Sequence, residues 1–216
     1  MFCPQCIQKI HRGAGACPHC GFSLAEADEV FGDADVLLTS LADTAGLLRQ
    51  RERAPVAAAM AAFNRRFPQL FVAVFSGRLG DVDQLRPFGF WLLNRAVFKD
   101  LPDRSNAAAV LLVIDPESKT AGLTFGYLLD AYLDETDTFD CLAAAHPYWL
   151  EGDYAGGIVR VIGRLRAVLA KRSRQARRRP QKFARRVQAP LVAESGVAGG
   201  CTTPVATNRP EPEVTP

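Results

Sequence analysis

Two closely spaced cysteine pairs constrain the start of the chain more than any other feature. The four cysteines, in the runs CPQC and CPHC, are Cys3, Cys6, Cys17 and Cys20. Two such C-x2-C knuckles can direct four thiolates at one tetrahedral Zn²⁺, and Gly21 after the second knuckle lets backbone N–H groups point at sulfur. A disulfide or a redox dithiol is the alternative, but so short a segment with few aliphatic residues has no core without the metal. Residues 1–22 are therefore expected to form a zinc ribbon around a structural Zn²⁺.

The remaining cysteines have no partner at metal-binding spacing. Cys141 is expected to be a small buried residue, and Cys201 a free thiol near the end of the chain. His19 lies inside the second knuckle and is expected at the surface, because four thiolates already complete the site.

The net charge of +3 hides an acidic body followed by a basic tail. Residues 160–186 could bind nucleic acid, an anionic membrane surface or an acidic protein, because each rewards the same release of counterions. The alternative is a solvated helix end that runs into disorder. We expect residues 173–216 to be a disordered tail, first basic and then rich in Pro, Ala and Thr.

The composition, 48% hydrophobic over 216 residues, favours a globular protein with a sizeable core. No run of about 18 apolar residues is present, and the start MFCPQC has no apolar segment typical of a secretion signal. The expected location is therefore the cytoplasm, with no transmembrane segment.

Periodicity divides the rest of the chain into helices and strands. Residues 23–34 are expected to be a linker, and residues 35–172 a domain. Helical spacing marks residues 56–67 and 82–96, and continuous apolarity marks buried strands at 70–75 and 109–114. VLLTSL, which begins at Val36, could add an edge strand.

The second buried strand leads into a hairpin. Asp115 and Pro116 occupy the first two positions of a type I turn, so the Asp115 carboxylate is expected to serve the turn. The returning strand, residues 119–127, has a face of small residues that a helix or a ligand can approach closely. Two further helices complete the pattern, and His146 is expected to pack in the apolar face of the first beside Trp149. Helices on both faces of a small mixed sheet make a three-layer αβα sandwich of the α/β class.

Five segments resemble the TPM domain, the family of thylakoid lumen and photosystem repair proteins and of many bacterial proteins. They are LADTAGLL, FNRRFPQLFVAVFSGRL, FGFWLLNRAVF, VLLVIDPESKTAGLTFGYLLDAYLD and EGDYAGGIVRVIGRL, in family order over about residues 35–170. The resemblance implies an αβα sandwich, a reported acid phosphatase activity, divalent cation binding near acidic loops and roles in maintaining membrane complexes.

The family's acidic positions carry over residue by residue. Its Gly-Tyr-Gly-Leu-Glu run corresponds to residues 126–130, with Leu128 at the second glycine and Asp130 at the glutamate. The other corresponding carboxylates are Asp43, Asp134 and Asp153. These four are the candidate catalytic residues, because carboxylates that converge on Mg²⁺ or Ca²⁺ could activate water for phosphate hydrolysis. Asp130 and Asp134 are also a candidate second metal site. A solvated or helix-capping face is the alternative for Asp134 and its neighbours Glu135 and Asp137.

Two functions from different classes follow. The first is an interaction or assembly module, in which the ribbon and the arginine-rich tail are binding elements for a protein partner. The second is a divalent-metal-dependent phosphatase that uses the acidic loops. The sequence has no G-x-S-x-G and no G-x-x-x-x-G-K-[ST] motif, which excludes the common hydrolase and nucleotide-binding signatures. The first function is the preferred hypothesis.

Overall fold

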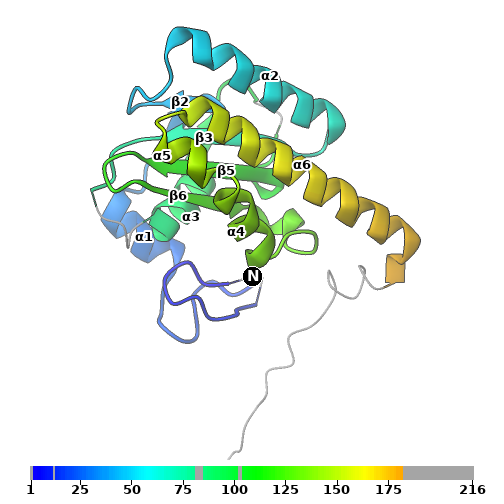
Figure 1. Cartoon of the computed structure of the whole chain (residues 1–216). Helices are drawn as coiled ribbons and strands as arrows, with labels where there is room; N and C mark the ends of the chain where they lie inside the picture. The colour runs from blue at the N-terminus through cyan, green and yellow to red at the C-terminus, as the bar shows by residue number, and fades with distance from the viewer. Residues whose placement is uncertain (1, 12, 81–84, 102–103, 182–216) are drawn as a thin grey trace, which may run out of the picture.

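A four-stranded sheet lies between two layers of helices (Figure 1). The computed structural model describes residues 2–11, 13–80, 85–101 and 104–181. In spatial order the strands are β2 (Leu41–Asp43), β3 (Phe71–Ser76), β5 (Ala109–Asp115) and β6 (Thr120–Phe125). The first three run parallel, and β6 returns antiparallel to β5. The three-layer α/β architecture expected from the sequence is confirmed.

Each face of the sheet has its own layer. One layer contains α2 (Gln50–Arg66), α4 (Glu135–Ala143), α5 (His146–Leu150) and α6 (Tyr154–Arg178). The other contains α1 (Leu24–Phe31), α3 (Leu85–Arg95) and the N-terminal cysteine segment. Short 3-10 turns, η2 (Asn106–Ala108) and η3 (Tyr127–Leu129), flank the hairpin strands.

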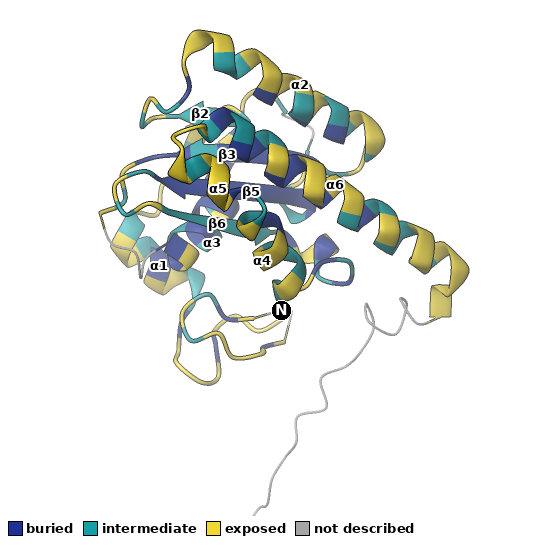
Figure 2. Cartoon of the chain, viewed as in Figure 1, coloured by how far each residue is buried: buried dark blue, intermediate teal, exposed yellow. Residues whose placement is uncertain are grey.

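Strand β5 is buried along its whole length (Figure 2). Its residues alternate between two hydrophobic cores: Leu112 packs with α2 and α6, and Leu111 packs with α3. Because both faces are covered, every position before the last residue, Asp115, is apolar, which explains the continuous run in the sequence.

The hairpin turn is built as its sequence predicts. The Asp115 carboxylate accepts hydrogen bonds from the Glu117 N–H at 2.9 Å and from Ser118 Oγ at 2.8 Å. Burial raises the pKa of Asp115, but these hydrogen bonds outweigh it, and the pKa lies below its usual range. Lys119 closes the turn with a φ of 56°. Asp115 therefore serves the turn.

Helix α3 approaches the small face of β6 closely. A Cβ placed on Gly89 would lie 2.5 Å from Thr124 Oγ1, well inside van der Waals contact. A Cβ on Gly122 would lie 3.2 Å from the Leu85 side chain. A helix, rather than a ligand, fills the space that the small residues leave.

Substitution of Gly89 by alanine is expected to destabilise the domain by about 1 to 3 kcal/mol, because the added methyl overpacks this contact. The double variant with Thr124→Ala should recover most of the loss, since the clashing Oγ1 is then absent. Urea unfolding of the single and double variants measures the loss of stability and its recovery. Equal stability of Gly89→Ala and the unmodified protein would contradict the close approach. Gly163→Ala, where a Cβ meets nothing within 4 Å, is the matched control.

The expected linker at residues 23–34 is wrong, because most of it forms helix α1. Ser23 caps the helix by accepting a hydrogen bond from the Glu26 N–H at 3.2 Å. Asp28 is paired with Arg95 of α3, and the Phe31 ring lies 5.4 Å from that of Trp91. The capping pattern S-L-A-E indicates the start of a helix, and Ala27 and Phe31 give that helix an apolar side. The overall composition of the segment, by contrast, is typical of a linker.

Residues after Val36 form two short strands. Strand β1 (Val36–Leu38) pairs in parallel with β4 (Ala96–Phe98), outside the main sheet. Strand β2 follows at once and adds the edge of the main sheet beside β3. The VLLTSL segment therefore forms a strand, β1, but not at the edge of the main sheet, which is formed by the following strand β2.

The last helix extends past the expected end of the domain at residue 172. Helix α6 continues to Arg178 because good helix formers persist and the first proline beyond is Pro180. Six residues assigned to the disordered tail are thus helical, and residues 182–216, including Cys201, lie outside the described residues. Within the described chain, no helix is both long and apolar enough to cross a membrane.

The predicted helix around His146 is divided into α4 and α5. Pro147 occupies the first turn of α5, where its missing N–H is tolerated, so a new helix begins there. His146 is exposed, which contradicts the expected packing in the core. Cys141 is buried as expected, with 1% of its surface exposed.

Candidate metal centre and carboxylate network

The four N-terminal cysteines converge on one point. Their sulfur atoms all lie within 4.8 Å of one another, with 3.7 Å between Cys3 and Cys20 and 3.6 Å between Cys6 and Cys17. A tetrahedral ion with a metal–sulfur distance of about 2.3 Å separates its ligands by about 3.8 Å. The distances are too long for disulfides, whose sulfurs lie about 2.05 Å apart. The cluster therefore has the geometry of a four-thiolate metal site.

The two knuckles repeat one backbone pattern. The N–H groups of Cys3 and Cys17 donate to the carbonyls of Gln8 and Phe22, at 2.9 and 2.8 Å. Each knuckle then closes at a residue with positive φ, Ile7 at 62° and Gly21 at 82°. In the sequence, the glycine at Gly21 indicates the second of these positions. At the first, a β-branched residue holds a conformation that such residues rarely adopt.

The thiols compete for ionisation without a cation. Burial raises the pKa of Cys17, but hydrogen bonds from the His19 and Cys20 N–H groups outweigh it and lower the value to about 6. At Cys20 a hydrogen bond from the Phe22 N–H lowers the pKa, yet burial and the neighbouring thiols raise it to about 12. One thiolate thus forms at the expense of another, and a bound cation is what would allow all four to ionise.

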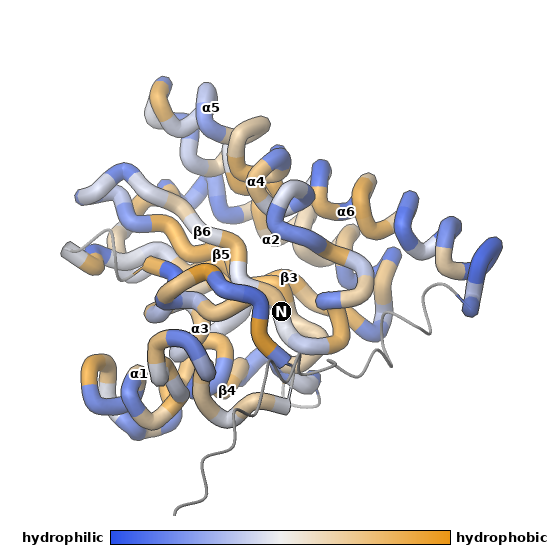
Figure 3. The backbone as a smooth tube through the Cα atoms, turned by 90° about the horizontal axis from the view of Figure 1, so that it is seen from below, coloured by the Kyte–Doolittle hydropathy of each residue, from blue (hydrophilic) through white to orange (hydrophobic). Residues whose placement is uncertain are grey.

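The cysteine segment is joined to the domain through a shared core. Cys3 and Cys17 are buried, and the Phe22 ring meets that of Phe90 on α3 edge-on, with centroids 5.6 Å apart. Ile10 and Phe22 belong to the same cluster of buried residues as Trp91. Figure 3 looks onto this side of the molecule, with α1 and β4 beside the N-terminal segment. The ribbon is therefore packed on the α3 side of the domain.

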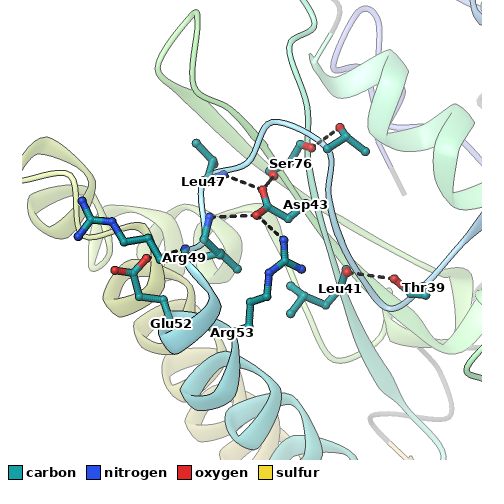
Figure 4. A network of polar contacts seen from close by, with 10 residues as sticks. Thr39, Leu41, Asp43, Leu47, Arg49, Glu52, Arg53 and Ser76 are labelled. Atoms are coloured by element: carbon teal, nitrogen blue, oxygen red, sulfur yellow. Dashed lines mark hydrogen bonds and ion pairs between the residues drawn. The ribbon is translucent and has the colours of Figure 1, made fainter.

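Asp43, at the end of β2, accepts four hydrogen bonds from its own chain (Figure 4). The donors are Leu47 N at 2.8 Å, Ser76 Oγ at 2.5 Å, Leu48 N at 3.0 Å and Arg53 Nη2 at 3.0 Å. Only 2% of the Asp43 side chain is exposed. Burial raises the pKa of Asp43. The hydrogen bonds from Ser76, Leu48 and Leu47 and the charge of Arg53 lower it by more, so the pKa lies below its usual value. The four bonds occupy the carboxylate's lone-pair positions, and the group holds the β2–α2 loop.

Asp134 and Asp153 cap helices. Asp134 Oδ1 accepts from the Asp137 N–H at 2.9 Å at the start of α4, and Arg172 Nη2 of α6 reaches Asp134 Oδ2 at 3.0 Å. Arg172 also contacts Asp137 Oδ2 at 2.9 Å. Asp153 accepts from the Gly156 N–H at 2.7 Å at the start of α6. The contacts of Asp134 match the helix-capping alternative, and Asp153 caps α6 in the same way.

The remaining acidic candidates occupy separate positions. Asp130 follows η3 at its C-terminal end, and Glu135 pairs with Arg86 of α3 at 2.9 Å. Within the described residues, only the four cysteines form a group of three or more potential ligands at metal-binding distance. The expected convergence of Asp43, Asp130, Asp134 and Asp153 on one metal is thus not seen. A catalytic role for any of them stays a prediction.

Sequence reasoning missed the partners of these carboxylates. Arg53 and Ser76 complete the Asp43 network, and Arg172 joins α6 to the start of α4. Asp43 followed by T-A-G-L-L is typical of a carboxylate that caps the loop after it, which was the available signal. Nothing local indicates Arg172, because its partners lie far away in the sequence.

Three solved structures are partly similar to this chain. The N-terminal domain of the cg2496 protein from Corynebacterium glutamicum has 14% identity and a TM-score of 0.45, over 60% of this chain and 78% of that chain. An N-terminal domain from P. gingivalis has 22% identity and a TM-score of 0.47, over 60% and 81%. The BA42 protein of Bizionia argentinensis has 14% identity and a TM-score of 0.49, over 58% and 83%.

No curated protein matches the sequence. The model of the TPM domain matches residues 41–168, which extend from β2 into α6 and cover more than half of the chain. This range contains the whole main sheet and excludes the cysteine segment and α1. The chain belongs to the TPM domain family.

Proposed function

We propose that the chain is an interaction and assembly module, in which a zinc-loaded ribbon and the arginine-rich end of α6 are the binding elements. The observation that carries the proposal is the state of the candidate carboxylates. Asp43, Asp134 and Asp153 already accept hydrogen bonds from their own chain, which leaves them poorly suited to hold a catalytic metal. A protein partner is the expected ligand.

Zinc is the proposed ion at the four cysteines. Four thiolates with tetrahedral spacing form a closed site with no open position for a substrate, which is typical of structural zinc. A cytoplasmic location belongs to the same proposal, because the thiols there stay reduced and available to the metal. The ion would contribute folding free energy to the ribbon and so maintain its outer surface, on which Phe2 and Ile7 are each 47% exposed.

The end of α6 is the second proposed element. Helix α6 is about 37 Å long, and its last turns extend beyond the sheet, with Arg174, Arg177 and Arg178 exposed (Figure 2). Cations on an overhanging helix can attract an acidic partner from a distance. Arg172 must be treated separately, since it joins α6 to α4.

The triple variant Arg174→Gln, Arg177→Gln, Arg178→Gln is expected to lose salt-sensitive binding to the partner that the full chain captures from extracts of its source cells. Quantitative affinity capture at two ionic strengths measures this. The charge-matched control is Arg51→Gln, Arg78→Gln, Arg160→Gln, at three exposed positions elsewhere.

A phosphatase assay distinguishes the enzyme alternative. The purified full chain with Mg²⁺ or Ca²⁺ should hydrolyse a generic phosphomonoester no faster than the metal alone. Turnover that is abolished by Asp130→Asn with Asp134→Asn would select the enzyme and overturn the module.

A further inference from the structure

Residues of α2 and α6 line a groove. The two helices lie on the side of the molecule opposite the ribbon (Figure 1). The volume of the groove is about 640 Å³, and it is largely open to solvent. The floor consists of small residues, Ala62 on α2 and Gly163, Ala167 and Ala170 on α6. The polar part of its lining is three guanidinium groups, those of Arg65, Arg66 and Arg166.

These three arginines differ from the arginines that join one element of the domain to another. Arg53, Arg95 and Arg172 each pair with a carboxylate of another element. Within the described residues, Arg65, Arg66 and Arg166 form no ion pair or hydrogen bond, and no acidic residue lines the groove. The recorded contact of Arg66 is with the Phe67 ring, whose centroid lies 5.8 Å from its Cζ. The groove therefore gathers positive charge that the fold does not neutralise.

The helix dipole of α2 is enough to explain why Arg65 and Arg66 are arginines. Arg65 and Arg66 occupy the last turn of α2, where cations interact favourably with the helix dipole. That account does not apply to Arg166, which lies in the middle of α6 and faces the same groove. Nor does it explain the open floor, since a Cβ on Gly163 would meet nothing within 4 Å. The helix interior thus carries a glycine that packing does not require.

We propose that the α2–α6 groove binds a di- or polyphosphate group. Guanidinium groups bind phosphate oxygens through paired, charge-assisted hydrogen bonds, and several of them can share a chain of phosphates. The small floor admits the phosphates between the helices. The lining contains no aromatic ring on which a base could stack and no long apolar side chain that could enter a bilayer. The recognised chemistry is therefore the phosphate chain itself.

This site goes beyond the proposed interaction module, since Arg65 and Arg66 belong to α2 and not to the end of α6. The two proposals also fail separately. Loss of partner capture in the variant of Arg174, Arg177 and Arg178 concerns the end of α6, whereas loss of polyphosphate binding concerns the groove.

Titration of the full chain with pyrophosphate and tripolyphosphate, followed by calorimetry and by NMR shifts of α2 and α6, tests the site. The variant Arg65→Gln, Arg66→Gln, Arg166→Gln should bind at least about tenfold more weakly. The control Arg51→Gln, Arg78→Gln, Arg160→Gln, which removes the same charge elsewhere, should bind within about twofold of the unmodified protein. Equal losses in the two variants would show a diffuse charge effect and overturn the site.

A second pair of variants separates binding from folding. Gly163→Glu places a carboxylate in the open floor beside the arginines, and Gly163→Ala fills the same position without charge. Both should raise the melting temperature, because glycine is unfavourable inside a helix. Only Gly163→Glu should lose tripolyphosphate. Equal binding by the two would overturn the proposal, as would the absence of binding at millimolar ligand.

The source of the phosphate is found with a nucleoside triphosphate in the same titration. Affinity equal to that of tripolyphosphate assigns the groove to free polyphosphate, and tighter binding assigns it to a nucleotide; both support the site. An oligonucleotide or anionic vesicles that bind equally to Gly163→Glu and Gly163→Ala, while tripolyphosphate binds to neither, would overturn it.

Discussion

Replacement of Asp43 by alanine is expected to destabilise the domain by about 2 to 4 kcal/mol. The change leaves the N–H groups of Leu47 and Leu48 without their acceptor in a site where the carboxylate is 2% exposed. It also removes the partner of Arg53, but that side chain is 39% exposed and can be hydrated, so most of the cost comes from the buried donors. Urea denaturation followed by circular dichroism measures the loss.

Asp153→Ala is the matched control, because it removes the same side chain from an exposed helix cap and should cost about 1 kcal/mol. Equal effects of the two substitutions would contradict the network.

The stability that Asp43 contributes depends on pH with a definite sign. The pKa of Asp43 in the folded protein is lower than in the unfolded chain, about 3.9, so its contribution is fully present above that pH. It is lost as the pH falls through the folded value, and Asp43→Ala should flatten this acid limb.

Replacement of Cys17 by serine is expected to weaken metal binding by more than about a hundred-fold, since changes outside the ligand shell already cost 10 to 100-fold. The ribbon should then unfold, because the described part of residues 2–23 has no backbone ladder beyond two isolated bridges to hold it. The loss should also loosen the α3 side, where Cys17 shares a core with Trp91. Metal analysis should give one equivalent of zinc for the unmodified protein and none for the variant.

Cys141→Ala is the control for this experiment, because it removes a buried thiol remote from the cluster and should leave the zinc content unchanged. NMR spectra separate the two effects. In the Cys17→Ser variant, the chemical shifts of the ribbon should lose their dispersion. Those of α3 should change, and those of α2 and α6 should stay the same. A variant that keeps its N-terminal shifts and its zinc would exclude the four-cysteine site.

The sequence was most informative where physical constraints are local. Four thiols at C-x2-C spacing predict a cluster with the geometry of a metal site whatever the rest of the fold, and Asp115 with Pro116 predicts a turn. The sequence predicts strand β5 because a strand covered on both faces is apolar along its length, here up to its last residue, Asp115. The small face of β6 was recognised too, although only the structure shows that α3 covers it at Gly89.

Features that depend on distant partners were not accessible. The acidic candidates are of the residue type that binds divalent cations. Their carboxylates, however, accept hydrogen bonds from Arg172, Ser76 and loop N–H groups, and these contacts depend on packing between elements far apart in sequence. Helix α1 was missed because its Asp, Glu and Ala content resembles a linker until α3 supplies Trp91 and Arg95 as partners. The helical pattern predicts His146 in the core, but Pro147 starts a new helix and leaves His146 exposed.

The connectivity of the main sheet has a consequence for the order of folding. Its parallel pairs join residues far apart along the chain, such as Leu41 with Val74 and Phe71 with Ala109, whereas β5 and β6 pair across a tight turn. Closing a long loop costs more entropy than closing a hairpin. The β5–β6 hairpin is therefore the piece best able to form early, and β3 and then β2 can add to it once their helices begin to cover the growing sheet.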